Sequence, residues 1–169
     1  MFFANATRGL ALAGTDFVYL DEGAYGVIFV NRDAGRIRKV YRRQQDEAHV
    51  RAVFDAEADA YIRAASSPAL LCLIPAHFQV CTLQQVIDRD GNDVSAEFFP
   101  NLAFETEFVN ATFHKIGNIG GDEIRCIRRL FRAAGINHTT DMSVSLTADG
   151  RISKVIDFAV EEHEIWHQD

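Results

Sequence analysis

The fold is decided by the stretch Gly23-Ala24-Tyr25-Gly26-Val27-Ile28-Phe29-Val30-Asn31-Arg32-Asp33-Ala34-Gly35-Arg36-Ile37-Arg38-Lys39-Val40-Tyr41-Arg42. Two runs within it, Val27–Val30 and Arg36–Arg42, contain β-branched and aromatic residues, and a turn with glycine precedes each of them. A third short run of this kind, Phe17–Tyr19, precedes the first turn. Together the three runs predict an antiparallel β-meander.

Outward from this stretch, a helix is predicted over Asp46–Ala65 because apolar residues recur there at spacings of three and four. Two longer runs, Phe78–Ile87 and Val94–Val109, predict strands around a polar turn, and Pro100 predicts a break or bulge in the second strand. The apolar face of the helix comprises Val50, Val53, Phe54, Ala58, Tyr61 and Ile62.

A second helix is predicted over Asp122–Ala134, and Gly135 ends it. Val144–Leu146 and Ile152–Phe158 then predict a small β-hairpin. The order of elements is three strands, a helix, two strands, a helix and two strands, which is typical of the α+β class. The first part is expected to be a five-stranded antiparallel sheet with one long helix.

Composition and charge exclude several classes of function. The chain has 169 residues and a net charge of −7, which predicts one domain and argues against a nucleic-acid partner. Three cysteines without a CxxC pair are typical of a reduced, cytoplasmic protein. No membrane partner is expected, because no apolar run approaches membrane-spanning length and no secretory signal is visible.

The turn Gly23-Ala24-Tyr25-Gly26 is a candidate phosphate-binding loop. Glycines between two strands let backbone N–H groups approach phosphates closely, and Tyr25 at the tip is expected to be exposed. A hairpin turn without a ligand is the alternative, which the turn alone favours.

Lys39 and Glu57 form a candidate ion pair. Side chains alternate along a strand, so Lys39 shares a face with Ile37 and Tyr41, away from the neighbouring arginines. From there it could reach the α- and β-phosphates of a nucleotide. Glu57 lies on the apolar side of the first helix, where a carboxylate needs a cationic partner. The alternatives are an exposed strand lysine and a boundary glutamate in water. The basic run Arg36–Arg43, taken alone, favours a strand with a solvated face.

Two aspartates are candidates for the chemistry itself. Asp157 follows a predicted buried strand, where a carboxylate is well placed to bind Mg²⁺. Asp141 precedes the hairpin and could orient or deprotonate an acceptor hydroxyl. A strand-end aspartate in water and a turn aspartate are the alternatives.

Taken together, these residues resemble the protein kinase-like superfamily, from about Phe17 to Phe158. By this resemblance Lys39 is the nucleotide lysine, Glu57 its partner and Asp141 the catalytic-loop aspartate. The resemblance also makes Gly23–Gly26 the glycine-rich loop. The remaining implied positions are the backbone of Glu107 and Val109, which faces adenine, and the metal-binding triplet Asp157-Phe158-Ala159.

The chain departs from the family pattern at several of these positions. Two residues instead of one separate His138 from Asp141, and Leu146 stands where the family has a metal-binding Asn. Ser143 or Ser145 is then the substitute metal ligand. The metal triplet ends in alanine instead of glycine, and a helical lobe of the kind that usually docks substrates is not expected from these 169 residues.

The resemblance implies a minimal kinase-like domain over residues 1–169, with a first lobe at 17–110 and a reduced second lobe at 111–169. Its expected activity is Mg²⁺-dependent transfer of a phosphoryl group from ATP to a hydroxyl, with a protein as the expected acceptor. By analogy, such a small enzyme would suit an effector delivered into a host cytosol. A catalytically inactive pseudokinase-type interaction module is the alternative.

A competing interpretation comes from His163-Glu164-Ile165-Trp166-His167. On a helix this His-Glu-x-x-His pattern places two imidazoles for Zn²⁺ and a glutamate as general base, which predicts a zinc metalloprotease. Only Gln168 and Asp169 follow His167 in this sequence, so the usual third ligand downstream is not expected, and His138, Glu161 or Asp169 would have to serve. A polar tail without metal is the alternative.

Overall fold

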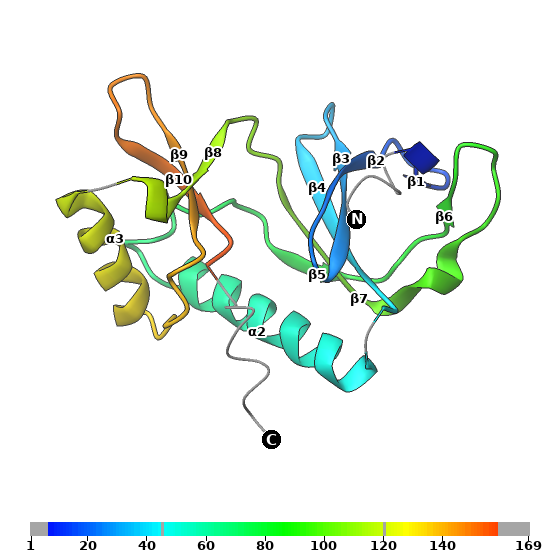
Figure 1. Ribbon diagram of the computed structural model, residues 1–169, viewed down its shortest axis with the longest axis horizontal. Coiled ribbons are helices and arrows are strands. Elements are labelled where there is room, and N and C mark those ends of the chain that lie inside the picture. The colour runs from blue at the N-terminus through cyan, green and yellow to red at the C-terminus, as the bar shows by residue number, and fades with distance from the viewer. Residues whose placement is uncertain (1–6, 45, 120, 159–169) are drawn as a thin grey trace. The chain divides into compact units, whose positions relative to one another are not determined.

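The computed structural model describes residues 7–44, 46–119 and 121–158. They form two compact units (Figure 1). Unit 1 takes its described residues from Met1–Phe54 and His77–Phe108, and unit 2 from Asp55–Ala76 and Val109–Asp169. The predicted zinc pattern and Ala159 lie outside the described residues.

Unit 1 is built on a curled antiparallel sheet. Its strands lie in the order β5-β7-β4-β3-β2-β1-β6. The prediction of five strands was wrong for this part of the chain, because a short strand precedes the meander and the predicted strand Phe78–Ile87 is two strands. The seven described strands are β1 (Ala11–Leu12), β2 (Val18–Glu22), β3 (Gly26–Asn31), β4 (Arg36–Arg42), β5 (Gln79–Cys81), β6 (Val86–Ile87) and β7 (Phe98–Glu107).

The curl of this sheet follows from its connectivity. β5 and β6 lie at opposite ends of the strand order, yet only residues 82–85 join them. A chain covers at most about 3.6 Å per residue. A connection of this length therefore requires the two edges of the sheet to approach each other. Cys81 pairs with Ala103 at one edge, and Val86 pairs with Leu12 at the other.

Curling turns one face of the sheet into an enclosed core. Val40 lies in this core, and Arg38 and Arg42 lie on the same face of β4 because side chains alternate. The prediction of a solvated arginine face was therefore wrong. Buried carboxylates compensate these cations, as described below. The core comprises Leu10, Leu12, Phe17, Val27, Phe29, Val40, Val86, Phe98 and Ala103.

The predicted break near Pro100 is confirmed. The run Val94–Val109 begins with the 3₁₀ turn η1 (Ser95–Glu97), and β7 follows it. The register between β4 and β7 shifts where Val40 pairs with Ala103 but Arg42 pairs with Phe98. Pro100 has no N–H to donate, so a ladder irregularity is expected there.

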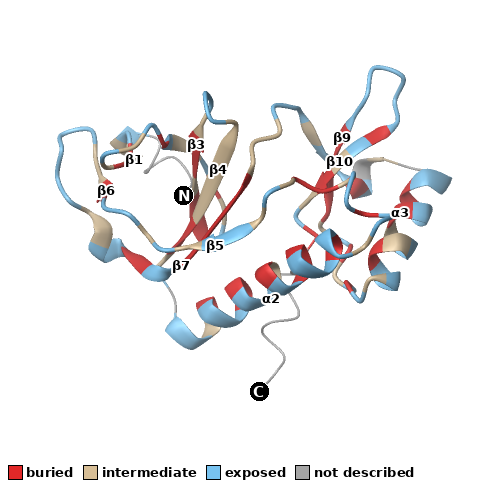
Figure 2. Ribbon diagram, turned by 180° about the vertical axis from the view of Figure 1, so that it is seen from behind, coloured by how far each residue is buried: buried red, intermediate tan, exposed pale blue. Residues whose placement is uncertain are grey.

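Helix α2 (Glu47–Ala65) confirms the first predicted helix, and its buried residues follow one face (Figure 2). Its first residues belong to unit 1, where the rings of Phe54 and Tyr41 meet edge to face at 5.4 Å. Ile62 was expected on the apolar face but is 55% exposed. Each residue turns the helix by about 100°, so the position after buried Tyr61 lies off the face that Ala58, Tyr61 and Ala64 share.

Unit 2 contains a second antiparallel sheet, in the order β10-β9-β8. Its strands are β8 (Phe113–Lys115), β9 (Ser143–Leu146) and β10 (Ile152–Ile156), and the 3₁₀ turn η2 (Ile116–Asn118) follows β8. The predicted hairpin is β9 and β10. Strand β8 was not predicted, because three residues are too short to show an alternating pattern.

Helix α3 (Asp122–Ala133) confirms the second predicted helix, with Ile124, Ile127 and Phe131 buried. Gly135 ends it with φ at 81°, the left-handed conformation that glycine adopts at low cost. Its N–H bonds to the carbonyl of Arg132 at 2.9 Å, and the N–H of Ile136 bonds to that of Phe131 at 3.0 Å. These two bonds define a Schellman motif.

The core of unit 2 centres on Phe158, which is 1% exposed. Its ring lies 4.8 Å from that of Tyr61 and 5.0 Å from that of Phe131. Backbone and side-chain bonds hold the preceding strand in place: the Val155 N–H bonds to the carbonyl of Leu73 at 2.7 Å, and Lys154 Nζ bonds to that of Ile74 at 2.9 Å. Strand β10, which leads into Phe158, is thus bonded both to β9 and to the segment that contains Leu73 and Ile74.

Burial of Tyr61 predicts a loss of stability at alkaline pH. Burial, and then the charges of Glu57 and Asp157, raise its pKa above the ordinary 10.0. The native state therefore keeps a proton that the unfolded state releases, so stability is full below pH 10 and falls above it by up to about 1.4 kcal/mol per pH unit. Tyr61→Phe should remove this loss. Urea unfolding of both proteins at pH 8 and pH 11 tests it, and equal losses would contradict it.

Candidate functional site

Four residues gather at one end of the three-stranded sheet in unit 2. Strand register brings them there, because Lys115 on β8 and Ile156 on β10 both pair with Ser143 on β9. Asp157 follows Ile156, and Asp141 lies two residues before Ser143. This end of the sheet, comprising Lys115, Asp141, Ser143 and Asp157, is called the strand-end cluster below.

Direct contacts hold the cluster together. The Ser143 hydroxyl donates to Asp157 Oδ2 at 3.2 Å, and Lys115 Nζ lies 3.6 Å from the same oxygen. Lys115 also donates to the backbone carbonyl of Asp141 at 2.8 Å. Ser143 is buried, whereas the side chain of Asp157 is 57% exposed. The cluster thus combines fixed groups with a carboxylate that solvent can reach.

Asp157 has a strained backbone. Its φ is 58°, the left-handed region that costs a residue with a Cβ about 1–3 kcal/mol. Such strain persists only where the surroundings enforce it, and here the buried ring of Phe158 follows directly. Strained residues of this kind concentrate at functional sites, so the conformation supports a role for Asp157.

The two serines that the sequence offered as metal ligands differ in position. Ser143 contacts Asp157, whereas the Ser145 hydroxyl accepts the Lys154 N–H at 3.1 Å and is buried. Of these two serines, only Ser143 is therefore placed to bind the same metal ion as Asp157. In the described ranges, no three His, Cys, Asp or Glu side chains are grouped to hold a metal ion.

The glycine turn in unit 1 is a tight hairpin loop between β2 and β3. The Gly23 N–H bonds to the Gly26 carbonyl at 2.9 Å. A Cβ on Gly26 would lie 2.6 Å from the Val40 carbonyl oxygen, so glycine is required there by the close approach of β4. The expectation that Tyr25 is exposed was wrong: it is buried, and its hydroxyl lies 3.4 Å from His49 Nε2.

A buried ion pair that was not predicted supports this turn. Arg42 Nη1 lies 2.7 Å from Glu22 Oε2, and the two side chains are 12% and 3% exposed. Arg42 also donates through Nη2 to the Gly23 carbonyl and through its backbone N–H to the Tyr25 carbonyl. Farther along β4, Arg38 Nε bonds to the buried Glu105 at 2.7 Å.

Lys39 lies on the other face of β4, as predicted. Its Nζ is 5.0 Å from the ring centroid of Tyr41 and 6.0 Å from that of Phe104, and the residue is half-buried. Glu57 is also half-buried, on the part of α2 that belongs to unit 2. Because Lys39 belongs to unit 1, the ion pair between them stays a prediction.

Glu107 and Val109 are the two residues expected to face adenine. Glu107 is the last residue of β7, and Val109 lies in the segment that follows. The Glu107 carbonyl accepts the Thr106 hydroxyl at 3.3 Å, and the Val109 carbonyl accepts the Ala111 N–H at 2.9 Å. Both carbonyls therefore already accept a hydrogen bond.

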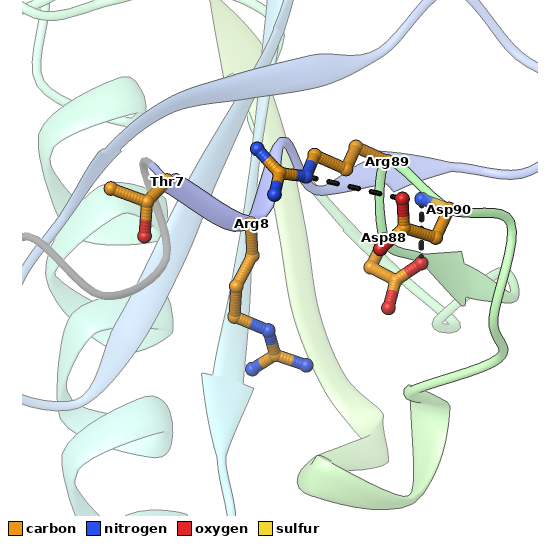
Figure 3. Close-up of a pocket in the computed structure, with 5 residues that line it drawn as sticks. All are labelled: Thr7, Arg8, Asp88, Arg89 and Asp90. Carbon is orange, nitrogen blue, oxygen red and sulfur yellow. Dashed lines mark hydrogen bonds and ion pairs between the residues drawn. The ribbon is translucent and has the colours of Figure 1, made fainter.

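An open charged depression lies elsewhere in unit 1 (Figure 3). Asp88 Oδ1 accepts the N–H groups of Asp90 and Asn92, each at 2.9 Å. Hydrogen bonds from Asn92 and Asp90 hold the Asp88 pKa below its ordinary value. This carboxylate therefore shapes a turn. The depression is lined by Thr7, Arg8, Asp88, Arg89 and Asp90.

No protein-family model matches the chain, and a comparison with curated proteins finds no match. Within the described part of the chain, none of the helices has the length and apolar character needed to cross a membrane. The structure establishes an α+β fold with two helices and a curled seven-stranded sheet in the described residues.

Proposed function

We propose that the chain is an ATP-dependent phosphotransferase of a minimal kinase-like type, acting on a protein hydroxyl. The strand-end cluster is the observation that carries this proposal. It joins a strained, solvent-accessible carboxylate at Asp157, a hydroxyl at Ser143 and a second aspartate at Asp141, on a buried scaffold. Phosphoryl transfer needs little more than positioning and charge neutralisation.

Asp157 and Ser143 fit a Mg²⁺ site of the sparse kind. This ion is commonly bound through one or two carboxylates, with water and substrate phosphates as the other ligands. Asp157 supplies one carboxylate, and the Ser143 hydroxyl lies 3.2 Å from it. When bound there, Mg²⁺ would neutralise charge on the phosphates.

Each further residue has a role that the resemblance to kinases suggests. Lys39 would bind phosphate oxygens, and Glu57 is its predicted partner. The turn Gly23–Gly26, in which the Gly23 N–H already bonds to the Gly26 carbonyl, covers the phosphates. Asp141 holds the acceptor hydroxyl and takes its proton as the acceptor oxygen bonds to the γ-phosphorus, while the bond from that phosphorus to the β–γ bridging oxygen breaks and ADP leaves.

Binding of ATP tests the proposal first. At about 100 times its Kd, Mg²⁺-ATP should stabilise the folded chain by about 2.7 kcal/mol and raise its melting temperature. Lys39→Met should weaken ATP affinity about tenfold or more, because a charge-assisted contact to phosphate is lost. Thermal unfolding and calorimetric titration measure both effects, with Mg²⁺-ATP, ATP plus chelator, and Zn²⁺ in parallel.

Arg89→Met is the matched control for Lys39→Met, because it removes the same charge from unit 1 at a side chain that is 70% exposed. Absence of any shift with ATP would contradict the proposal. If the wild type binds ATP but releases no more ADP than the Asp141→Asn variant does, the result would instead support an inactive interaction module. A shift with Zn²⁺ alone would favour the metalloprotease interpretation of His163–His167.

A further inference from the structure

Lys115 is a fixed cation that the proposed mechanism does not use. Its Nζ is held by the Asp141 carbonyl at 2.8 Å and lies 3.6 Å from Asp157 Oδ2. The side chain is nevertheless 58% exposed, so its ammonium group is both oriented and open to solvent. An ammonium group has three N–H donors, so one hydrogen bond to a carbonyl leaves two donors for another acceptor.

The contacts of Asp157 leave room for a ligand. Ser143 donates a hydrogen bond to Asp157 Oδ2, and Lys115 forms an ion pair with the same oxygen. In the part of the chain that the structure describes, no hydrogen bond or ion pair reaches Oδ1. A metal ion on Oδ1 and an ammonium beside Oδ2 are therefore compatible. The charges of Asp157 and Lys115 cancel, so any bound divalent cation leaves a net positive site.

The number of carboxylates also bears on the role of this lysine. Protein kinases hold two Mg²⁺ ions against the phosphates, which requires ligands for both. The described residues supply no group of three acidic, His or Cys side chains, and Leu146 stands where the family's second metal ligand is expected. Lys115, whose Nζ lies 3.6 Å from Asp157 Oδ2, is a side chain of the strand-end cluster that can supply a second positive charge there.

We infer that Lys115 binds the phosphoryl group that is transferred, with its ammonium in the place of a second metal ion. The inference rests on the proposed function for the class of ligand, a nucleoside triphosphate. The ammonium would bond to non-bridging oxygens of the terminal phosphate beside a single Mg²⁺ on Asp157. A cation so placed stabilises the negative charge of the phosphoryl group during transfer.

A purely structural role for Lys115 makes a different prediction. An ion pair whose two side chains are 58% and 57% exposed contributes little to stability in water. Lys115→Met should therefore leave the urea midpoint almost unchanged, while the affinity for phosphate falls. If Lys115→Met lowers the stability but leaves the phosphate affinity unchanged, the role of Lys115 is structural.

Calorimetric titration with tripolyphosphate, with and without Mg²⁺, tests the inference, and Mg²⁺-ATP is titrated in parallel. Lys115→Met should bind tripolyphosphate about tenfold more weakly, and Lys115→Arg should recover most of the loss because it keeps the charge. Arg151→Met is the matched control, since it removes the same charge from unit 2 at a side chain that is 80% exposed. It should bind as the wild type does.

The outcomes separate this inference from the proposed function. If Lys115→Met binds tripolyphosphate and Mg²⁺-ATP as tightly as the wild type, the inference is wrong and the phosphotransferase proposal stands. If tripolyphosphate binding depends on Lys115 but ATP does not bind, the proposed function is wrong and Lys115 remains an anion-binding residue. An equal loss in Arg151→Met would show unspecific charge attraction and overturn the inference.

Discussion

Phe158→Ala is expected to lower the free energy of unfolding of unit 2 by about 3–5 kcal/mol, the range for truncating a buried phenylalanine. The ring is 1% exposed and packs between the rings of Tyr61 and Phe131, at 4.8 and 5.0 Å. Truncation removes both aromatic contacts and leaves a cavity where α2, α3 and the end of β10 supply the walls. A loss this large exceeds most single substitutions.

Hydrogen exchange resolved by mass spectrometry measures this loss locally, because peptides of 109–158 and of 8–44 report the two units separately. Phe113→Ala is the control, since Phe113 is a half-buried phenylalanine of the same unit, and it should cost clearly less. Equal losses in the two variants would show that Phe158 is not the centre of the core. Full protection of unit 2 in Phe158→Ala would contradict the packing argument outright.

The same variant connects the core to the site. Asp157 has a φ of 58°, and the buried ring of Phe158 follows it directly. Once the ring is lost, Asp157 can relax to an ordinary conformation and move away from Ser143 and Lys115. Under the proposed function, surviving folded Phe158→Ala should bind Mg²⁺-ATP more weakly although it retains every charged group.

Local pattern was enough to predict the elements whose signal lies within one segment. Both helices were predicted to within one residue of their ends, since apolar periodicity, a proline after α2 and a glycine after α3 all lie in the segment itself. Strand β4 was predicted with its observed ends for the same reason. Strands β1 and β8 were missed because two or three residues carry no period.

What the sequence could not show is which face of β4 becomes enclosed. Alternation separated Lys39 from the arginines correctly, but the side with three arginines was expected to face water. The curl of the sheet depends on β5 and β6 pairing at opposite edges, which no local pattern reveals. Lys115 escaped notice for a related reason, because its place beside Asp157 follows from the register of β8 with β9.

Glu22→Ala is expected to cost about 3–5 kcal/mol in unit 1, because it leaves a buried cation without its counter-ion. Arg42 is 12% exposed on its side chain and bonds to Glu22 at 2.7 Å. Its Nε is already buried without a hydrogen-bond partner among the described residues. Urea unfolding measures the loss. Glu22→Gln, which keeps an oxygen acceptor of the same shape, should cost less, and an equal cost would mean that charge is not the cause.

A double variant separates the energetics of this pair from its position. Replacing a buried ion pair by apolar residues of similar volume is often neutral, so Glu22→Leu combined with Arg42→Met should recover much of the stability that Glu22→Ala loses. It cannot recover the bond from Arg42 to the Gly23 carbonyl, nor the orientation that this bond gives the glycine turn. If the turn binds phosphate as proposed, the double variant should be stable yet weak in ATP binding. Full affinity would show that Gly23–Gly26 is only a hairpin turn.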